Sequence, residues 1–222
     1  MPRASRIVIP GLAHHVTQRG NRRQPIFFSD EDRETYKGLI SHYCGKTGTR
    51  CLAWCLMDNH VHLILVPPST DDLRATLAAA HTVYSQRINA AQQTSGHLFQ
   101  GRFASYAMDE AHLFMAARYV ENNPVKAGLV SRAEDWPWSS ARAHVSGRSD
   151  GLTDISSLSG WIANWRAMLE RGLEAADESE EVERATRSGL PLAKAQWREA
   201  LAAELGRRLT PLRVRQHRQE RN

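Results

Sequence analysis

The sequence lacks any run of 18 apolar residues, and its first residues contain no apolar stretch of the signal-peptide type. We therefore expect a soluble, intracellular protein with no membrane partner. Cysteine is scarce, because Cys44, Cys51 and Cys55 are the only three and none has CxxC spacing. Neither a disulfide framework nor a cysteine zinc site is indicated.

Lysine is also scarce, since only four of the 29 basic residues are lysines. The arginine guanidinium binds phosphate with two parallel hydrogen bonds and stacks on bases, so this composition favours nucleic acid weakly. Residues 1–29 contain five arginines and no acid. Residues 206–222 contain six arginines and one glutamate, a net charge of +5 that equals that of the whole chain. Both segments suit a nucleic-acid arm, and both also suit a solvated surface.

The apolar pattern predicts the order strand, helix, strand, strand, helix, strand between residues 12 and 106. Ser29 is expected to cap the first helix, with Asp32 in the capping-box position. This order is typical of an α+β fold with a ferredoxin-like, split βαβ core and an antiparallel sheet. Both helices are expected on one face, which leaves the other face free for a ligand. The expected strands are 12–19, 50–57, 60–66 and about 102–106.

We place a compact domain at residues 1–147 and a variable extension at 148–222, because composition changes near Gly147. Residues 150–160 indicate a linker or loop. Residues 174–183 hold six acids and no base, which is typical of a solvated face or a disordered spacer. Residues 192–205 suit an amphipathic helix.

Two histidines, His60 and His62, stand where the third strand begins. Alternate side chains of a strand share a face, so these imidazoles are about 7 Å apart along it and could bind one ion between them. Two solvated histidines at a strand edge are an equally good interpretation. Tyr119 and Asn123 are four residues apart on an expected helix from Asp109 to Asn122, and they share a face. Tyr119 by itself suits a core position.

Five blocks of the sequence, taken together and in order, resemble the REP-associated tyrosine transposases, a branch of the single-tyrosine HUH transposases. The resemblance covers roughly residues 12–145. The blocks are HVTQRGN (15–21), MDNHVH (57–62), HLFQGRF (97–103), YVENNPVKAGLV (119–130) and WPWSS (136–140).

The resemblance implies a bacterial, nucleoid-associated enzyme that cuts and transfers single-stranded DNA next to a palindromic REP hairpin. It implies that His60, His62 and Asn123 bind a divalent metal, Mg²⁺ or Mn²⁺. Tyr119 is implied as the nucleophile that forms a 5′-phosphotyrosine. Neutral imidazole and amide ligands leave the charge of such an ion available to phosphate oxygens. The partners implied are single-stranded DNA and the REP hairpin, and the protein is expected to be a monomer or a homodimer.

Candidate DNA contacts are the basic and amide side chains near the expected site and in the tail. They are Arg19, Arg22, Arg23, Gln100, Arg102, Arg207, Arg208, Arg213 and Arg215. Three other functions stay open. One is a hairpin-binding protein that does not cut, another is a metal-dependent hydrolase that uses water, and the third is a replication-initiator or relaxase nickase.

Overall fold

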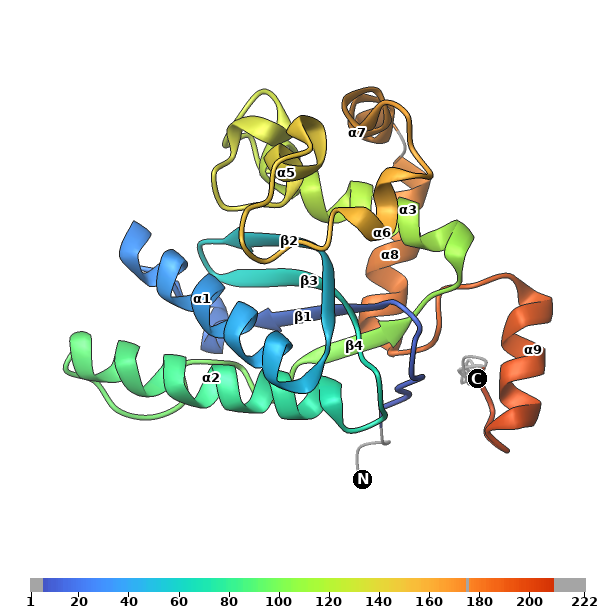
Figure 1. The fold of residues 1–222 in the computed structure, drawn as a ribbon. Helices are drawn as coiled ribbons and strands as arrows, with labels where there is room; N and C mark the ends of the chain where they lie inside the picture. Colours follow the sequence, from blue (N-terminus) through green and yellow to red (C-terminus); the bar gives the residue numbers. More distant parts are fainter. Residues whose placement is uncertain (1–5, 175, 210–222) are drawn as a thin grey trace, which may run out of the picture.

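A computed structural model describes residues 6–174 and 176–209 of the chain (Figure 1). Its centre is a four-stranded sheet in the order β2-β3-β1-β4, in which every neighbouring pair is antiparallel. This is the order of a ferredoxin-like sheet, so the predicted α+β fold class is confirmed. The strands are β1 (His14–Arg19), β2 (Arg50–Met57), β3 (His60–Val66) and β4 (Ala104–Ala107).

Helices α1 (Asp30–Thr47) and α2 (Asp72–Ala91) cover one face of the sheet (Figure 1). The predicted capping box is present, because Ser29 Oγ accepts from the Asp32 amide while the Asp32 carboxylate accepts from the Ser29 amide. Gly48 ends α1 in the left-handed conformation, with φ of 72°. Local sequence signals therefore fix both ends of this helix.

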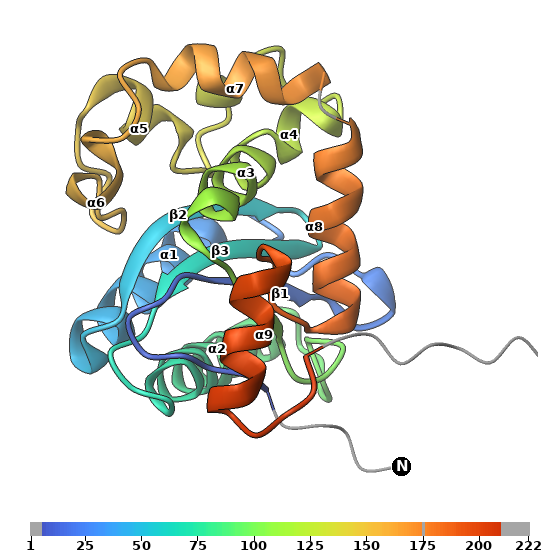
Figure 2. The ribbon, with the colours of Figure 1, turned by 90° about the vertical axis from the view of Figure 1, so that its right-hand side faces the viewer.

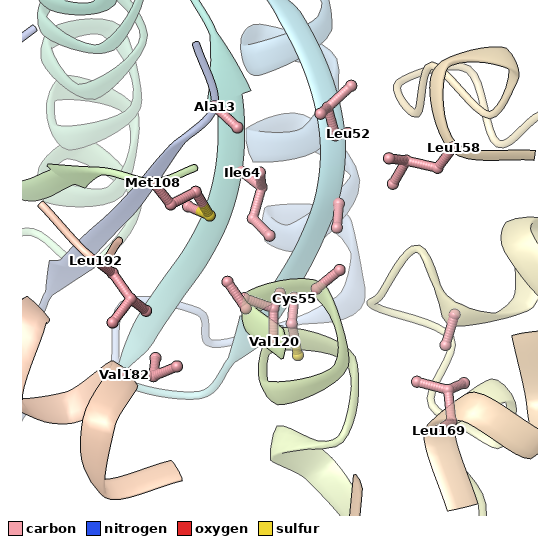
Figure 3. Close-up of a cluster of buried hydrophobic side chains, with 14 of the residues drawn as sticks. Ala13, Leu52, Cys55, Ile64, Met108, Val120, Leu158, Leu169, Val182 and Leu192 are labelled. Atoms are coloured by element: carbon pink, nitrogen blue, oxygen red, sulfur yellow. The ribbon is translucent and has the colours of Figure 1, made fainter. Parts of the chain in front are cut away.

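The opposite face is covered too, by α3 (Glu110–Glu121) and α8 (Ala176–Ser188), as Figure 1 and Figure 2 both show. The expectation that this face is free was wrong. The physical reason is visible in the apolar cluster of Figure 3, where Val120 of α3 and Val182 of α8 pack with Ile64 of the sheet. An uncovered face would leave these side chains in water.

Glu121 anchors α3 to the part of the chain that follows it. Its carboxylate has no exposed surface, and it accepts hydrogen bonds from Ser140 Oγ at 2.5 Å and from Trp165 Nε1 at 2.7 Å. His144 Nδ1 lies 2.6 Å from the same carboxylate. Asn122 Nδ2 adds a bond of 2.8 Å to the Leu169 carbonyl oxygen. These hydrogen bonds fix the C-terminal end of the helix that carries Tyr119 against residues 140–169.

The extension packs on the domain and does not form a separate linker and spacer. Asp150 and Thr153 bond the buried indole of Trp54 at 2.9 and 3.0 Å. The acidic residues expected in a solvated face or spacer lie largely in α8, where Glu178 pairs with Arg118 of α3. The remaining helices are α4 (Asn123–Lys126), α5 (Ala141–Ser146), α6 (Ser156–Ser159), α7 (Trp165–Glu174) and α9 (Ala195–Glu204), with single 3₁₀ turns at Asn21–Arg23 and Ala133–Asp135.

No helix within the described ranges combines the length and apolarity needed to span a bilayer.

Candidate functional site

The two histidines of the HxH motif open β3 on the face that α3 covers. His60 pairs with Arg19 of β1 and His62 with Thr17, which places both imidazoles at the end of the two central strands. Their ring centroids are 4.9 Å apart, and the rings are nearly perpendicular. The sequence prediction that they share one face is confirmed.

The orientation of His60 is fixed by its neighbour in the turn between β2 and β3. Asn59 Nδ2 donates to the Arg23 carbonyl oxygen at 3.1 Å, so Asn59 Oδ1 is the atom that lies 2.7 Å from His60 Nδ1. An amide oxygen only accepts, and His60 Nδ1 therefore carries the proton. The Nε2 lone pair of His60 is left available for a ligand.

His62 is held by a third histidine, His15 of β1. His62 Nδ1 and His15 Nε2 are 2.9 Å apart, and the two rings are within 3° of parallel. His62 Nε2 is buried and has no hydrogen-bond partner among the described residues. A buried imidazole nitrogen without a partner is costly, unless it serves a ligand.

All three imidazoles are uncharged at neutral pH. Burial lowers the pKa of His60 to about 4, and Arg19 lowers it further while Asp58 opposes this. Burial lowers the pKa of His15 to about 3. The pKa of His62 lies well below its usual value because of burial first, and then because of His60, His15 and Arg19. Neutral imidazoles keep the lone pairs that a metal ligand needs.

Tyr119 lies on the last turn of α3, and its ring centroid is 5.6 Å from that of His62. The helix ends at Glu121, and Asn123 then opens α4 with Pro124 in its first turn, close to the end predicted from this proline. Asn123 Nδ2 donates to the Tyr119 carbonyl oxygen at 3.0 Å, which leaves Asn123 Oδ1 as a possible ligand atom. Tyr119 is half-buried and packs against the apolar cluster.

The surroundings of Tyr119 hold its phenol in the protonated form. Burial raises its pKa above the usual value, and Glu183 of α8 raises it further. A hydrogen bond from Asn123 and the charges of Arg19 and Arg187 act in the opposite direction. If this oxygen serves as a nucleophile, another group has to assist in removing its proton.

The residues present fit a hard divalent ion. The available ligand atoms are Nε2 of the neutral His60 and His62 and the amide oxygen of Asn123. Among the described residues, the buried His62 Nε2 has no hydrogen-bond partner. Within residues 6–174 and 176–209, no three His, Cys, Asp or Glu side chains gather closely enough to hold a metal. A site built here would thus have two imidazoles and keep positions open for substrate oxygens.

Four of the candidate DNA contacts come from two loops that meet beside His60. The Asn21 amide donates to the Leu98 carbonyl oxygen at 2.8 Å, and the Gln100 amide donates to that of Arg19 at 2.9 Å. A Cβ on Gly20 would collide with the Gln24 carbonyl oxygen, so this turn requires glycine. The structure brings together Arg19, Arg22, Arg23 and Gln100, of which all but Arg19 are exposed.

The other candidates do not join this group. Arg102 and Arg207 line a cavity of about 510 Å³ at the edge strand β4, together with Arg6 and Arg187. Arg208 is exposed beyond α9. Arg213 and Arg215 lie outside the described residues.

Sequence reasoning gave no role to His15, Asn59, Glu183 or Arg187. His15 and Asn59 stand inside two of the quoted blocks, and a known strand register would have indicated that His15 reaches His62. Nothing in the acidic run indicates that Glu183 lies beside Tyr119, because that contact depends on how α8 docks.

Residues 9–123, just over half of the chain, match the sequence family described as IS200-like transposases. A Haemophilus influenzae protein assigned to the REP-associated tyrosine transposases is 29% identical over 129 residues, which cover 53% of this chain and 71% of that protein. A solved structure of a REP-associated tyrosine transposase bound to a REP hairpin matches with a TM-score of 0.57. The match covers 74% of this chain and 93% of the other at 22% identity, so it supports the fold alone.

Proposed function

The chain belongs to the IS200-like transposase family, and from this premise we propose that it cuts and rejoins single-stranded DNA beside a palindromic hairpin. The reaction is a transesterification through a covalent bond between Tyr119 and a 5′-phosphate. The similarity to REP-associated proteins favours a REP-type hairpin as the substrate. The resemblance inferred from the five sequence blocks agrees with the family match.

One observation carries the proposal. The ring of Tyr119 makes an edge contact with His62, with centroids 5.6 Å apart, and Asn123 follows four residues later. His62 Nε2 is buried and has no partner among the described residues. The proposed nucleophile from a helix thus lies beside two neutral imidazoles from a strand, and Asn123 is bonded to the main chain of that nucleophile. A structural tyrosine would not need the buried orphan nitrogen beside it.

His60, His62 and Asn123 would hold Mg²⁺ or Mn²⁺, and the ion when bound would draw electron density from the scissile phosphate. Tyr119 Oη forms a bond to phosphorus, and the bond from phosphorus to the 3′ oxygen breaks. The phenol proton leaves Tyr119, and the departing 3′ oxygen takes up a proton to become a hydroxyl. Attack by a 3′-hydroxyl reverses the exchange, so strand transfer needs no external energy source.

The DNA backbone would be positioned by the two loops beside His60. Arg22 and Arg23 project from a turn that lies next to the metal ligands, and Gln100 is attached to the same turn through the Arg19 carbonyl oxygen. Guanidinium groups at this place can hold phosphates on either side of the scissile bond. The arginines around β4 would contact the strand farther away.

The test is a denaturing gel of the protein with labelled hairpin oligonucleotides from its own genome, in Mg²⁺, Mn²⁺ or chelator. We expect a metal-dependent covalent adduct that Tyr119→Phe abolishes. Tyr106→Phe is the matched control, because Tyr106 faces the same site from β4 and has no proposed chemical role. It should keep the adduct.

Binding without an adduct in both metals would contradict the proposal and would favour a hairpin-binding protein that does not cut. Metal-dependent cleavage that survives Tyr119→Phe would favour a hydrolase that uses water.

A further inference from the structure

We propose that His15 is a positioning residue that makes His62 present its Nε2 atom to the metal. The proposal rests on the metal site of the proposed function, and it adds a residue to which neither the resemblance nor the family assigns a role. His15 would not touch the ion or the DNA. It would act through its hydrogen bond to His62 Nδ1.

The two ligands of the HxH motif differ in how firmly their proton positions are set. Asn59 Oδ1 can only accept, so His60 has its proton on Nδ1 and its lone pair on Nε2. His62 has no such fixed acceptor. Its Nδ1 faces another imidazole nitrogen, which can either donate or accept.

Two arrangements of protons are therefore possible between His15 and His62. If His15 Nε2 donates, His62 has its proton on Nε2 and cannot bind a cation there. If His15 Nε2 accepts, His62 Nε2 is bare and His15 has its proton on Nδ1. Only the second arrangement matches that of His60, and a cation beside His62 Nε2 selects it electrostatically.

The geometry suits this role. His15 and His62 are both buried, and their ring planes are within 3° of parallel. The hydrogen bond between His15 Nε2 and His62 Nδ1 is 2.9 Å long. His15 Nδ1 and His62 Nε2, the outer atoms of the pair, both lack partners among the described residues. With both rings neutral, the tautomer of His15 and the tautomer of His62 are therefore set together, and they decide whether the outer atom of His62 is a donor or a ligand.

The test is Mn²⁺ binding to the full chain without DNA, measured from the electron paramagnetic resonance signal of free Mn²⁺. Loss of an outer hydrogen-bond partner typically costs about 10- to 100-fold in metal affinity, and we expect that loss for His15→Leu. His15→Gln should keep most of the affinity, because Gln Oε1 can accept where His15 Nε2 does. His14→Leu is the matched control, since His14 is equally buried on the same strand and points to the opposite face.

Unchanged Mn²⁺ affinity in His15→Leu would overturn the role of His15 and leave the proposed enzyme intact. Failure of the wild-type chain to bind Mn²⁺ would instead remove the metal site, and this inference with it. A second measurement does not depend on how the variants fold. In Mg²⁺-saturated wild-type protein, imidazole ¹⁵N chemical shifts should place the His62 proton on Nδ1, and a proton on Nε2 would overturn the proposal.

Discussion

The two faces of the central sheet differ in how their buried polar side chains are hydrogen-bonded. On the face that α1 and α2 cover, Tyr84 Oη donates to the Ile26 carbonyl oxygen at 2.6 Å, and Tyr36 Oη lies 2.9 Å from His81 Nε2. Both tyrosines are fully buried and both hydroxyls are satisfied. On the other face, His62 Nε2 and His15 Nδ1 are buried, and neither has a partner in the part of the chain that the structure describes.

Adjacent residues of one strand show the contrast most directly. His62 and Leu63 follow each other in β3, and they are 5% and 0% exposed. Leu63 belongs to the apolar cluster with α1 and α2, whereas His62 belongs to the site.

Buried polar atoms without partners among the described residues occur on both faces, since Ser105 pairs with Val16 and its Oγ is one of them. Only on the α3 face do two such atoms belong to one hydrogen-bonded pair, His15 and His62, beside Tyr119. The difference teaches that an isolated unpaired atom accompanies packing, whereas a cluster of them beside a reactive side chain indicates a site.

Of the predicted effects, the largest is the loss of adduct formation in His62→Leu, which changes the site face alone. Metal-assisted phosphate chemistry is worth several kcal/mol, so removing this ligand should reduce adduct formation by at least about 1,000-fold. The free energy of unfolding should fall by only about 1–3 kcal/mol, because His15 Nε2 loses its partner while the Nε2 of His62, unpaired in the described part of the chain, is removed. Single-turnover cleavage assays and urea unfolding of the same preparation measure the two quantities. A His62→Leu variant that loses much stability but cleaves at the wild-type rate would contradict our assignment of the two faces.

Leu63→Ala is the mirror experiment on the neighbouring residue. Truncating a fully buried leucine typically costs about 2–5 kcal/mol of unfolding free energy, through lost burial and the cavity that remains. Cleavage by the folded fraction should persist, because the side chain points away from Tyr119 and His62. Urea unfolding and cleavage at low temperature check this. Loss of cleavage in a fully folded variant would show that the faces are coupled.

The pH dependence of cleavage tests the site face further, and the expected change in rate is smaller than that in His62→Leu. In the proposed reaction Tyr119 loses its proton when it attacks, and burial together with Glu183 raises its pKa above the usual value. Below that pKa, the phenolate fraction and hence the single-turnover rate should rise roughly tenfold per pH unit through the neutral and mildly alkaline range. Hairpin binding measured in chelator at the same pH values is the control. A rate that is flat or falls as pH rises would show that phenol ionisation does not limit attack.

Much of the sheet and its first helix could be predicted because local signals specify them. The bounds of β2 and β3 agree with those expected, and Ser29 and Asp32 begin α1 as predicted. The prediction that His60 and His62 share a face depends only on strand alternation. Their roles as ligands, with those of Tyr119 and Asn123, stay predictions.

What sequence could not predict depends on contacts between distant segments. The acidic run gives no local sign that it docks as α8, because Val182 and Ala185 are buried against α3 and strands that are far away in the chain. His15 was overlooked for a similar reason. Its partner is 47 residues away, and only the register of β1 against β3 brings the two rings together.

The buried carboxylate of Glu121 has a consequence for how such chains change in evolution. Two of its partners, Ser140 and His144, belong to residues 1–147, but Trp165 belongs to the extension. A descendant that lost the extension would retain a carboxylate with an unmet acceptor in its core, and such a group is strongly destabilising. A chain cut before Trp165 should therefore be more stable with Gln at position 121 than with Glu, because an amide costs less to bury than an unpaired carboxylate.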